Sequence, residues 1–205
     1  MQRSRMPVRR SGLGVLALAG LILAACGGGG GGSNDGGGGN GGGIDATFAG
    51  AASAGVGAVS MAAGASAGAD FDVNVLVQGP LSNFFGIALR VQVPSGVLLL
   101  PGSTGDSSIL LQESPDSTIF DASQTQAGAE VLVTATRVQP GSGFDNGVDV
   151  GAGIFQVMRL RFRAQSATAG NLTPVNTELR TCSDGTQTCT AVGGAQFTGG
   201  SLVAN

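Results

Sequence analysis

Residues 70–93 read DFDVNVLVQGPLSNFFGIALRVQV, and the pattern of apolar side chains in this stretch decides the fold class. In residues 70–77, every second side chain from Phe71 to Val77 is apolar. After residues 78–83 the same spacing returns and places one set of side chains on a single face: Phe85, Ile87, Leu89, Val91 and Val93. A period of two residues is typical of a strand that buries one face. The stretch therefore predicts two strands joined by a loop at residues 78–83.

The chain from about residue 54 onward continues this pattern in short segments separated by Gly, Pro, Asp and Ser. Further strands are predicted at residues 56–62, 97–100, 107–112, 117–122, 129–138, 153–164, 173–181 and 195–204. No segment keeps a long period of 3.6 residues, so little helix is expected. About nine short strands with closely spaced turns predict an all-β domain over residues 54–205, a β-sandwich of the jelly-roll type.

Residues 1–25 have the pattern of a secretory signal peptide. Four arginines, at positions 3, 5, 9 and 10, precede the apolar residues 13–25, and this apolar segment is shorter than the roughly 20 residues that cross a bilayer. The segment ends in Leu23-Ala24-Ala25-Cys26, which resembles the lipobox of bacterial lipoproteins. The resemblance implies that Cys26 carries acyl chains such as palmitate and becomes the first mature residue. An ordinary signal peptide with a nearby cysteine is the alternative.

The resemblance also bears on location. Gly27 follows the cysteine where an aspartate would favour retention in the inner membrane, so a lipid anchor in the outer membrane of a bacterial cell envelope is expected. Residues 26–53 are predicted to be a Gly- and Ala-rich linker, because residues 27–43 cannot bury enough apolar surface to offset their ordering entropy. As a coil, residues 27–43 would span roughly 20–25 Å. Residues 44–55 are expected to continue the linker unless Ile44 and Phe48 dock on the domain.

Composition excludes several kinds of function. Without the signal peptide, six arginines stand against 13 acidic residues, a net charge near −7, so nucleic acid is not an expected partner. Lys, His, Trp and Tyr are absent. Without histidine there is no Ser-His or Cys-His pair and no imidazole-metal site, and no cofactor is predicted.

Three stretches resemble cohesin domains, the receptor modules of cellulosome scaffolding proteins. Residues 67–102 look like the G-D-x-F-x-V-x-V strand of that family followed by a loop, a second strand and P-S-x-L. Residues 129–164 are similar to a strand, a loop and a G-x-L-x-x-L-x-F-x strand, with Gly153, Leu160 and Phe162 in place. Residues 197–205 resemble the closing strand. The resemblance implies a nine-stranded jelly roll that binds another protein through one sheet face; in cellulosomes this partner is a dockerin, a small calcium-binding helical module.

Cys182 and Cys189 frame the sequence CSDGTQTC. If residues 184–187 form a four-residue hairpin loop, the two cysteines lie opposite one another within reach of a disulfide, which an exported chain would form. Such a bond adds about 2.5 kcal/mol by chain entropy. A redox or metal pair is the alternative.

Oxygen ligands suited to calcium occur at Asp145, Asn146 and Asp149, although their spacing does not match an EF-hand loop. A polar loop with Asp and Asn turns is the alternative interpretation. Two carboxylate pairs, Glu113 with Asp116 and Asp145 with Asp149, are the nearest candidates for hydrolytic chemistry, and neither has supporting context.

Arg159, Arg161 and Arg163 alternate along one predicted strand, so they share an outer sheet face. They form either a solvated strand face or a stripe that binds an acidic protein, a polysaccharide or a lipid phosphate. Phe84 and Phe85 are adjacent, so one of them is expected to point outward, either under a loop or as an anchor for a partner.

The sequence thus predicts a membrane-anchored lipoprotein that presents a non-catalytic, cohesin-like protein-binding module. The alternative is a carbohydrate-binding module of similar fold, which the absence of Trp and Tyr makes less favourable because such modules stack sugar rings on these side chains.

Overall fold

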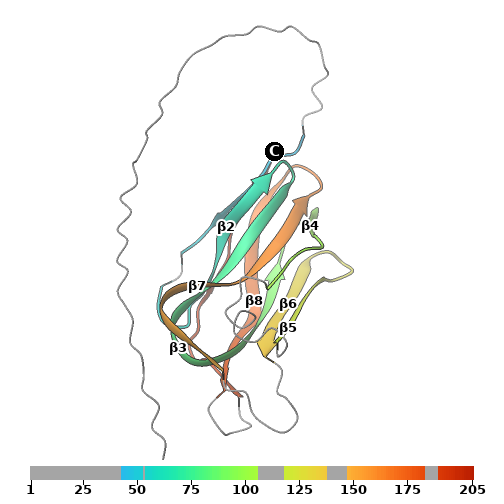
Figure 1. The fold of residues 1–205 in the computed structure, drawn as a ribbon. Helices are drawn as coiled ribbons and strands as arrows, with labels where there is room; N and C mark the ends of the chain where they lie inside the picture. The colour runs from blue at the N-terminus through green and yellow to red at the C-terminus, as the bar shows by residue number, and fades with distance from the viewer. Residues whose placement is uncertain (1–42, 53, 106–117, 138–146, 183–188) are drawn as a thin grey trace, which may run out of the picture. The chain divides into compact units, whose positions relative to one another are not determined.

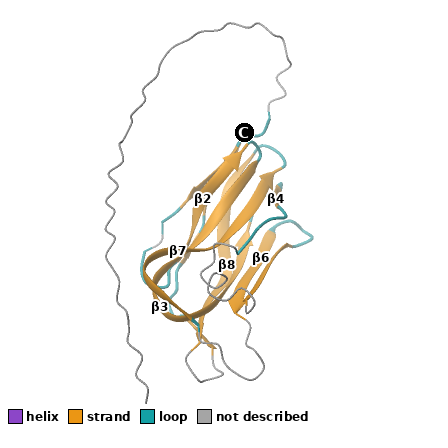
Figure 2. Ribbon diagram, viewed as in Figure 1, coloured by secondary structure: helices purple, strands orange, loops and turns teal. Residues whose placement is uncertain are grey.

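One strand, β3 (Asp70–Gln92), runs through both halves of the domain (Figure 1). The computed structural model describes residues 43–52, 54–105, 118–137, 147–182 and 189–205. The described residues belong to one compact unit. Eleven strands and no helix lie within the described residues (Figure 2). Besides β3 they are β1 (Ala46–Gly50), β2 (Val59–Ala67), β4 (Val97–Leu99), β5 (Thr118–Gln124), β6 (Glu130–Arg137), β7 (Val148–Ala164), β8 (Thr168–Cys182), β9 (Cys189–Ala191), β10 (Phe197–Thr198) and β11 (Gly200–Ala204).

The two halves of β3 have different neighbours. The first half pairs with β2 on one side and β7 on the other, and the second half pairs with β6 and β8. Next to these strands, β4 pairs with β7, β5 with β6, and β11 joins β8 to β1. The predicted all-β sandwich is confirmed. The predicted strand at residues 107–112 lies outside the described residues.

The predicted loop at residues 78–83 is instead part of β3, and the prediction of two separate strands is corrected. Leu81 pairs with Val150 of β7 and Phe84 pairs with Val148, so the ladder continues through this stretch. Register shifts before and after Leu81 absorb the irregular backbone, as β-bulges do. Asn83 has a φ of 55°, and its N–H donates to Oδ1 of Asp149 at 3.0 Å.

The core lies between the inward faces of two groups of strands, those that pair with the first half of β3 and those that pair with its second half. The alternating side chains of β3 are buried in both halves, from Phe71 to Val77 and from Ile87 to Val93. Arg90 and Gln92 are exposed on the opposite face, as their positions in the alternation predict. The ring of Phe71 stacks between Phe48, at 6.4 Å between centroids, and Phe162, at 5.5 Å.

The predicted linker over residues 26–53 overlaps a strand, so the boundary at residue 54 is corrected. β1 pairs along its length with β11, and Phe48 is only 4% exposed. The alternating pattern of β1 has only two buried positions, Ala46 and Phe48. Because glycines and alanines surround them, this pattern is hard to recognise in the sequence. The sequence left open whether Phe48 docks on the domain, and the structure shows that it does.

Phe84 and Phe85 are both buried, at 0% and 8% exposure, so neither is an exposed anchor; of the two alternatives, only a covered phenylalanine agrees with the structure. The β3–β8 register shifts between Phe84 and Gly86, which breaks strict alternation at this point.

Gln124, at the end of β5, connects the two halves at the side where β4 and β5 meet. Its amide nitrogen donates to the carbonyl oxygens of Val97 and Gly128, each at 2.8 Å, and its Oε1 accepts from the N–H of Leu99 at 2.8 Å. One side chain therefore satisfies three backbone groups on two segments, β4 and the turn that follows β5.

Gln124→Leu is expected to lower the free energy of unfolding by about 1–3 kcal/mol, because partly buried backbone groups lose their partners. Urea denaturation measures this change. Gln92→Leu, a substitution at an exposed position of β3, is the control and is expected to change the midpoint little. Equal midpoints for the two variants would contradict the role of Gln124.

Candidate partner-binding face

The three arginines of the predicted stripe lie in a row on the outer face of β7, opposite acidic residues of β3. Register pairing puts Arg163 across from Asp70 and Arg161 across from Asp72. Arg163 binds Asp70 through two hydrogen bonds, and its Nη2 lies 2.9 Å from Oδ2. Asp72 lies between two guanidinium groups, with Oδ1 3.4 Å from Nε of Arg161 and Oδ2 3.9 Å from Nε of Arg159.

These contacts change the interpretation of the stripe. Two carboxylates compensate three guanidinium groups, so the row has one positive charge in excess rather than three. Gly64 of β2 lies beneath Asp72, where an added Cβ would come within 2.8 Å of the Asp72 Cβ. The alternating aspartates at residues 70 and 72 were visible in the sequence, but the sequence does not reveal which strand lies beside them. The arrangement favours cross-strand pairing over a free anion-binding stripe.

The Arg163 guanidinium lowers the pKa of Asp70 below its ordinary value of 3.8, chiefly through the hydrogen bond. A carboxylate with a lowered pKa stabilises the folded state at neutral pH, and this contribution is lost as the pH falls below about 4. The melting temperature of Asp70→Asn is therefore expected to lie below that of the wild type at pH 7 and to approach it near pH 2. Asp121→Asn, at an exposed position of β5, serves as the control. A constant difference across this range would contradict the assignment.

A second outer face lies over the second half of β3 and carries a shallow hollow of about 290 Å³. Its floor consists of Gly86 and Ala88, and its sides are Thr134 and Thr136 of β6 together with Glu178 and Arg180 of β8. Gly86 lies in register between Thr136 and Arg180, and Ala88 between Thr134 and Glu178. We call this hollow the β3 trough. Its floor is low because β3 presents almost no side-chain volume there.

Gly86 shapes the trough through close contact. A Cβ added at Gly86 would lie 2.7 Å from Oγ1 of Thr136, so only glycine lets the Thr136 side chain lie over the strand. A glycine in the interior of a strand often marks such a close approach. A glycine within a strong strand pattern, here Gly86, is therefore the feature of the sequence that indicates this site.

Apolar side chains stand beside the trough on the same face. Ile119 of β5 is 51% exposed and lies across from Thr136, and Leu132 of β6 is 37% exposed and lies across from Arg90. Exposed isoleucine and leucine side chains beside a hollow are features of protein-binding surfaces.

Charged groups on this face are paired within the chain. The Arg180 guanidinium lies 3.0 Å from Oε1 of Glu178, and Nε of Arg90 lies 3.8 Å from Oε2 of Glu130. All four residues are partly or largely exposed, so these pairs add little stability but can exchange partners in a complex.

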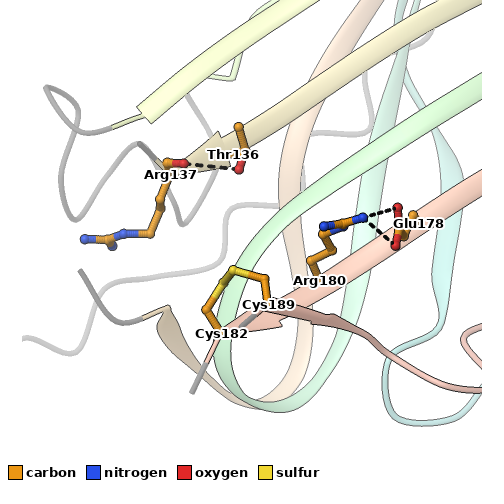
Figure 3. The surroundings of a disulfide bond; sticks show 6 residues. All are labelled: Thr136, Arg137, Glu178, Arg180, Cys182 and Cys189. Carbon is orange, nitrogen blue, oxygen red and sulfur yellow. Dashed lines mark hydrogen bonds and ion pairs between the residues drawn. A yellow bond between two sulfur atoms is a disulfide. The ribbon is translucent and has the colours of Figure 1, made fainter. Parts of the chain in front are cut away.

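The predicted disulfide is confirmed: Cys182 at the end of β8 is bonded to Cys189 at the start of β9, directly across the ladder. Figure 3 shows the disulfide at the end of the strand that carries Glu178 and Arg180. The hairpin residues 183–188 lie outside the described residues. The bond holds β9 against the outer edge of β8, and therefore supports the strand that forms one side of the β3 trough.

Of the remaining candidates for calcium binding or hydrolysis, Asp149 alone lies within the described residues. Asp149 accepts a hydrogen bond from the backbone of Asn83, whereas Asp145, Asn146, Glu113 and Asp116 lie outside the described residues. Across the part of the chain that the structure describes, no group of three or more Cys, Asp or Glu side chains could hold a metal ion. Cys26 also lies outside it. In the same part, no helix has the length and apolar character needed to cross a membrane.

The structure is similar to the crystal structure of a type II cohesin domain from the cellulosome of Acetivibrio cellulolyticus. The sequence identity is 11% and the TM-score is 0.51, and the match covers 71% of this chain and 94% of that chain. No protein-family model matches the sequence, and no curated protein matches it significantly. The similarity shows that the described domain has a cohesin-like fold.

Proposed function

We propose, from this cohesin-like fold, that the chain is a non-catalytic protein-binding lipoprotein of the bacterial envelope. The observation that carries the proposal is the β3 trough, a hollow with a small-residue floor beside exposed Ile119 and Leu132. Protein interfaces combine apolar anchors, a partly polar rim and a shape that a partner side chain can fill. The trough has these three properties on a rigid sheet.

The partner class follows from the resemblance to cohesins. A dockerin-like helical module is the partner that the resemblance implies, and another surface protein would use the same face. Polysaccharide binding is the competing function. It receives less support because the face offers aliphatic side chains and no Trp or Tyr on which a sugar ring would stack.

The test fills the trough. Immobilised protein comprising residues 43–205 is exposed to a bacterial envelope extract, and retained proteins are identified by mass spectrometry. Ala88→Arg is expected to weaken binding of the retained protein at least about 30-fold, the loss expected when an interface hot spot is blocked. Ala169→Arg, at an exposed alanine of β8 that does not line the trough, is the matched control and is expected to bind as the wild type does.

Two results would overturn this proposal. Equal loss of binding in both arginine variants would show that the partner does not use the trough. Retention of polysaccharide in place of protein, with the same dependence on Ala88, would instead establish the carbohydrate-binding function.

The anchor is tested separately. Acyl chains contribute about 0.8 kcal/mol per buried CH₂, and more than one chain holds a protein firmly on a membrane. Wild-type protein is therefore expected in the membrane fraction, with an N-terminal peptide that begins at acylated Cys26, and Cys26→Ser is expected in the soluble fraction. A membrane-bound Cys26→Ser protein would disprove anchoring through this residue.

A further inference from the structure

The strand that follows the linker is paired with the last strand of the domain. β1 is antiparallel to β11 in unbroken register from Ala46 and Ala204 to Gly50 and Gly200. Backbone bonds extend this ladder at both ends, from Asp45 N–H to Asn205 O at 3.0 Å and from Ala51 N–H to Gly199 O at 3.1 Å. Ala46 N–H also donates to Gly68 O at 2.8 Å, which joins β1 to the turn between β2 and β3.

Side-chain packing fixes β1 in this position. Phe48 is 4% exposed and stacks on Phe71 of β3. At the other end of the strand, a Cβ added at Gly50 would collide with the carbonyl oxygen of Met61 in β2. β1 is therefore held from two sides, by the β11 ladder and by contacts to β2 and β3.

The start of the described chain, through which the proposed anchor would be attached, and the β3 trough lie toward opposite ends of the domain. Asp45 is bonded to Asn205 and Ala46 to Gly68, so the start of β1, the turn between β2 and β3 and the C-terminus, marked C in Figure 1, lie at the same end of the domain. β3 starts beside this end at Asp70 and runs away from it to the register shifts between Gly79 and Phe84. Gly86 of the trough follows directly after that irregular segment.

We propose that β1 is the strand that transmits mechanical tension between the N-terminal anchor and a partner bound at the β3 trough; this rests on the proposed anchoring and binding. Inter-strand hydrogen bonds in an antiparallel pair are perpendicular to the strands. Tension that pulls residue 43 away from the irregular segment of β3, between Gly79 and Phe84, acts along β1. All hydrogen bonds between β1 and β11 then bear this tension together. Tension that pulls residue 43 away from Asn205 opens the same ladder one bond at a time.

The test pulls single molecules in both geometries. The unlipidated chain from Cys26 to Asn205 has one thiol outside the disulfide, Cys26, which accepts the first handle. A second handle is attached at Ser82→Cys, an exposed position beyond the middle of β3, or at Asn205→Cys. The force that releases β1 is expected to be at least about threefold higher with the Ser82→Cys handle, because the bonds are then loaded in parallel.

Side-chain variants identify β1 as the strand that yields. Phe48→Ala is expected to lower the release force in the Ser82→Cys geometry, whereas Thr47→Ala, at the exposed neighbouring position, is expected to leave it unchanged. Equal forces in the two pulling geometries, or equal effects of the two alanine variants, would overturn the role of β1 in transmitting tension. The measurement involves neither lipid nor partner, so it can fail while the anchor and the binding face are upheld, and the converse also holds.

Discussion

A chain that begins at residue 54 is expected to melt about 6–16 °C below a chain that begins at residue 43, which corresponds to a loss of roughly 3–4 kcal/mol. The shorter chain lacks β1 and with it the buried Phe48. Burial of a phenylalanine side chain contributes about 2–3 kcal/mol, and the β11 backbone would also lose its ladder partner. Calorimetry on the two purified chains measures the difference.

The matched comparison is built into this design, because both chains lack residues 1–42 and differ only in residues 43–53. If β1 were a dispensable part of the linker, the two chains would melt within about 2 °C of one another, a difference of less than about 1 kcal/mol. That result would contradict the docked strand. It would also remove the basis for the role of β1 in transmitting tension.

Phe71→Ala is expected to lower the free energy of unfolding by about 3–5 kcal/mol, the range observed when a buried phenylalanine is truncated. Phe71 is 1% exposed, and its ring lies between Phe48 of β1 and Phe162 of β7. Removal of the ring leaves a cavity with two aromatic walls from different strands. Urea denaturation with a linear extrapolation measures the loss.

Phe71→Leu is the control for this substitution, because it keeps most of the apolar volume and is expected to cost less than the alanine variant. Phe120→Ala, at a partly buried position of β5, tests whether the loss depends on how deeply the phenylalanine is buried. A loss below about 1 kcal/mol for Phe71→Ala would show that the aromatic stack does not contribute to the core as the structure indicates.

The sequence predicts the fold where the alternation is strong and fails where backbone contacts matter more than side-chain pattern. The valines from Val73 to Val77 and the apolar residues from Ile87 to Val93 predict their own burial correctly. The connection between them is different: Pro80 and Asn83 favour a loop, but pairing with β7 keeps this segment in the sheet. β1 was assigned to the linker because its partner, β11, lies at the opposite end of the sequence.

The candidate site shows the same limit. The cysteine pair was predicted because a short hairpin is a local feature, and Arg159, Arg161 and Arg163 were correctly placed on one face. Their ion pairs with Asp70 and Asp72 depend on which strand lies beside β7, and the single sequence contains no such information. The β3 trough depends in the same way on three strands from different parts of the chain.

The pairing of the first and last strands also determines when this domain can become complete. β11 follows all the other strands in the sequence, and it provides the ladder on which β1 lies. β3 meanwhile requires β6, β7 and β8, all of which follow it in the sequence. Contacts of such large sequence separation slow folding, because the chain must be ordered over long distances before the contacts stabilise it. The sandwich therefore closes only after residues 200–204 have been synthesised, and a chain that lacks these residues loses the support of β1.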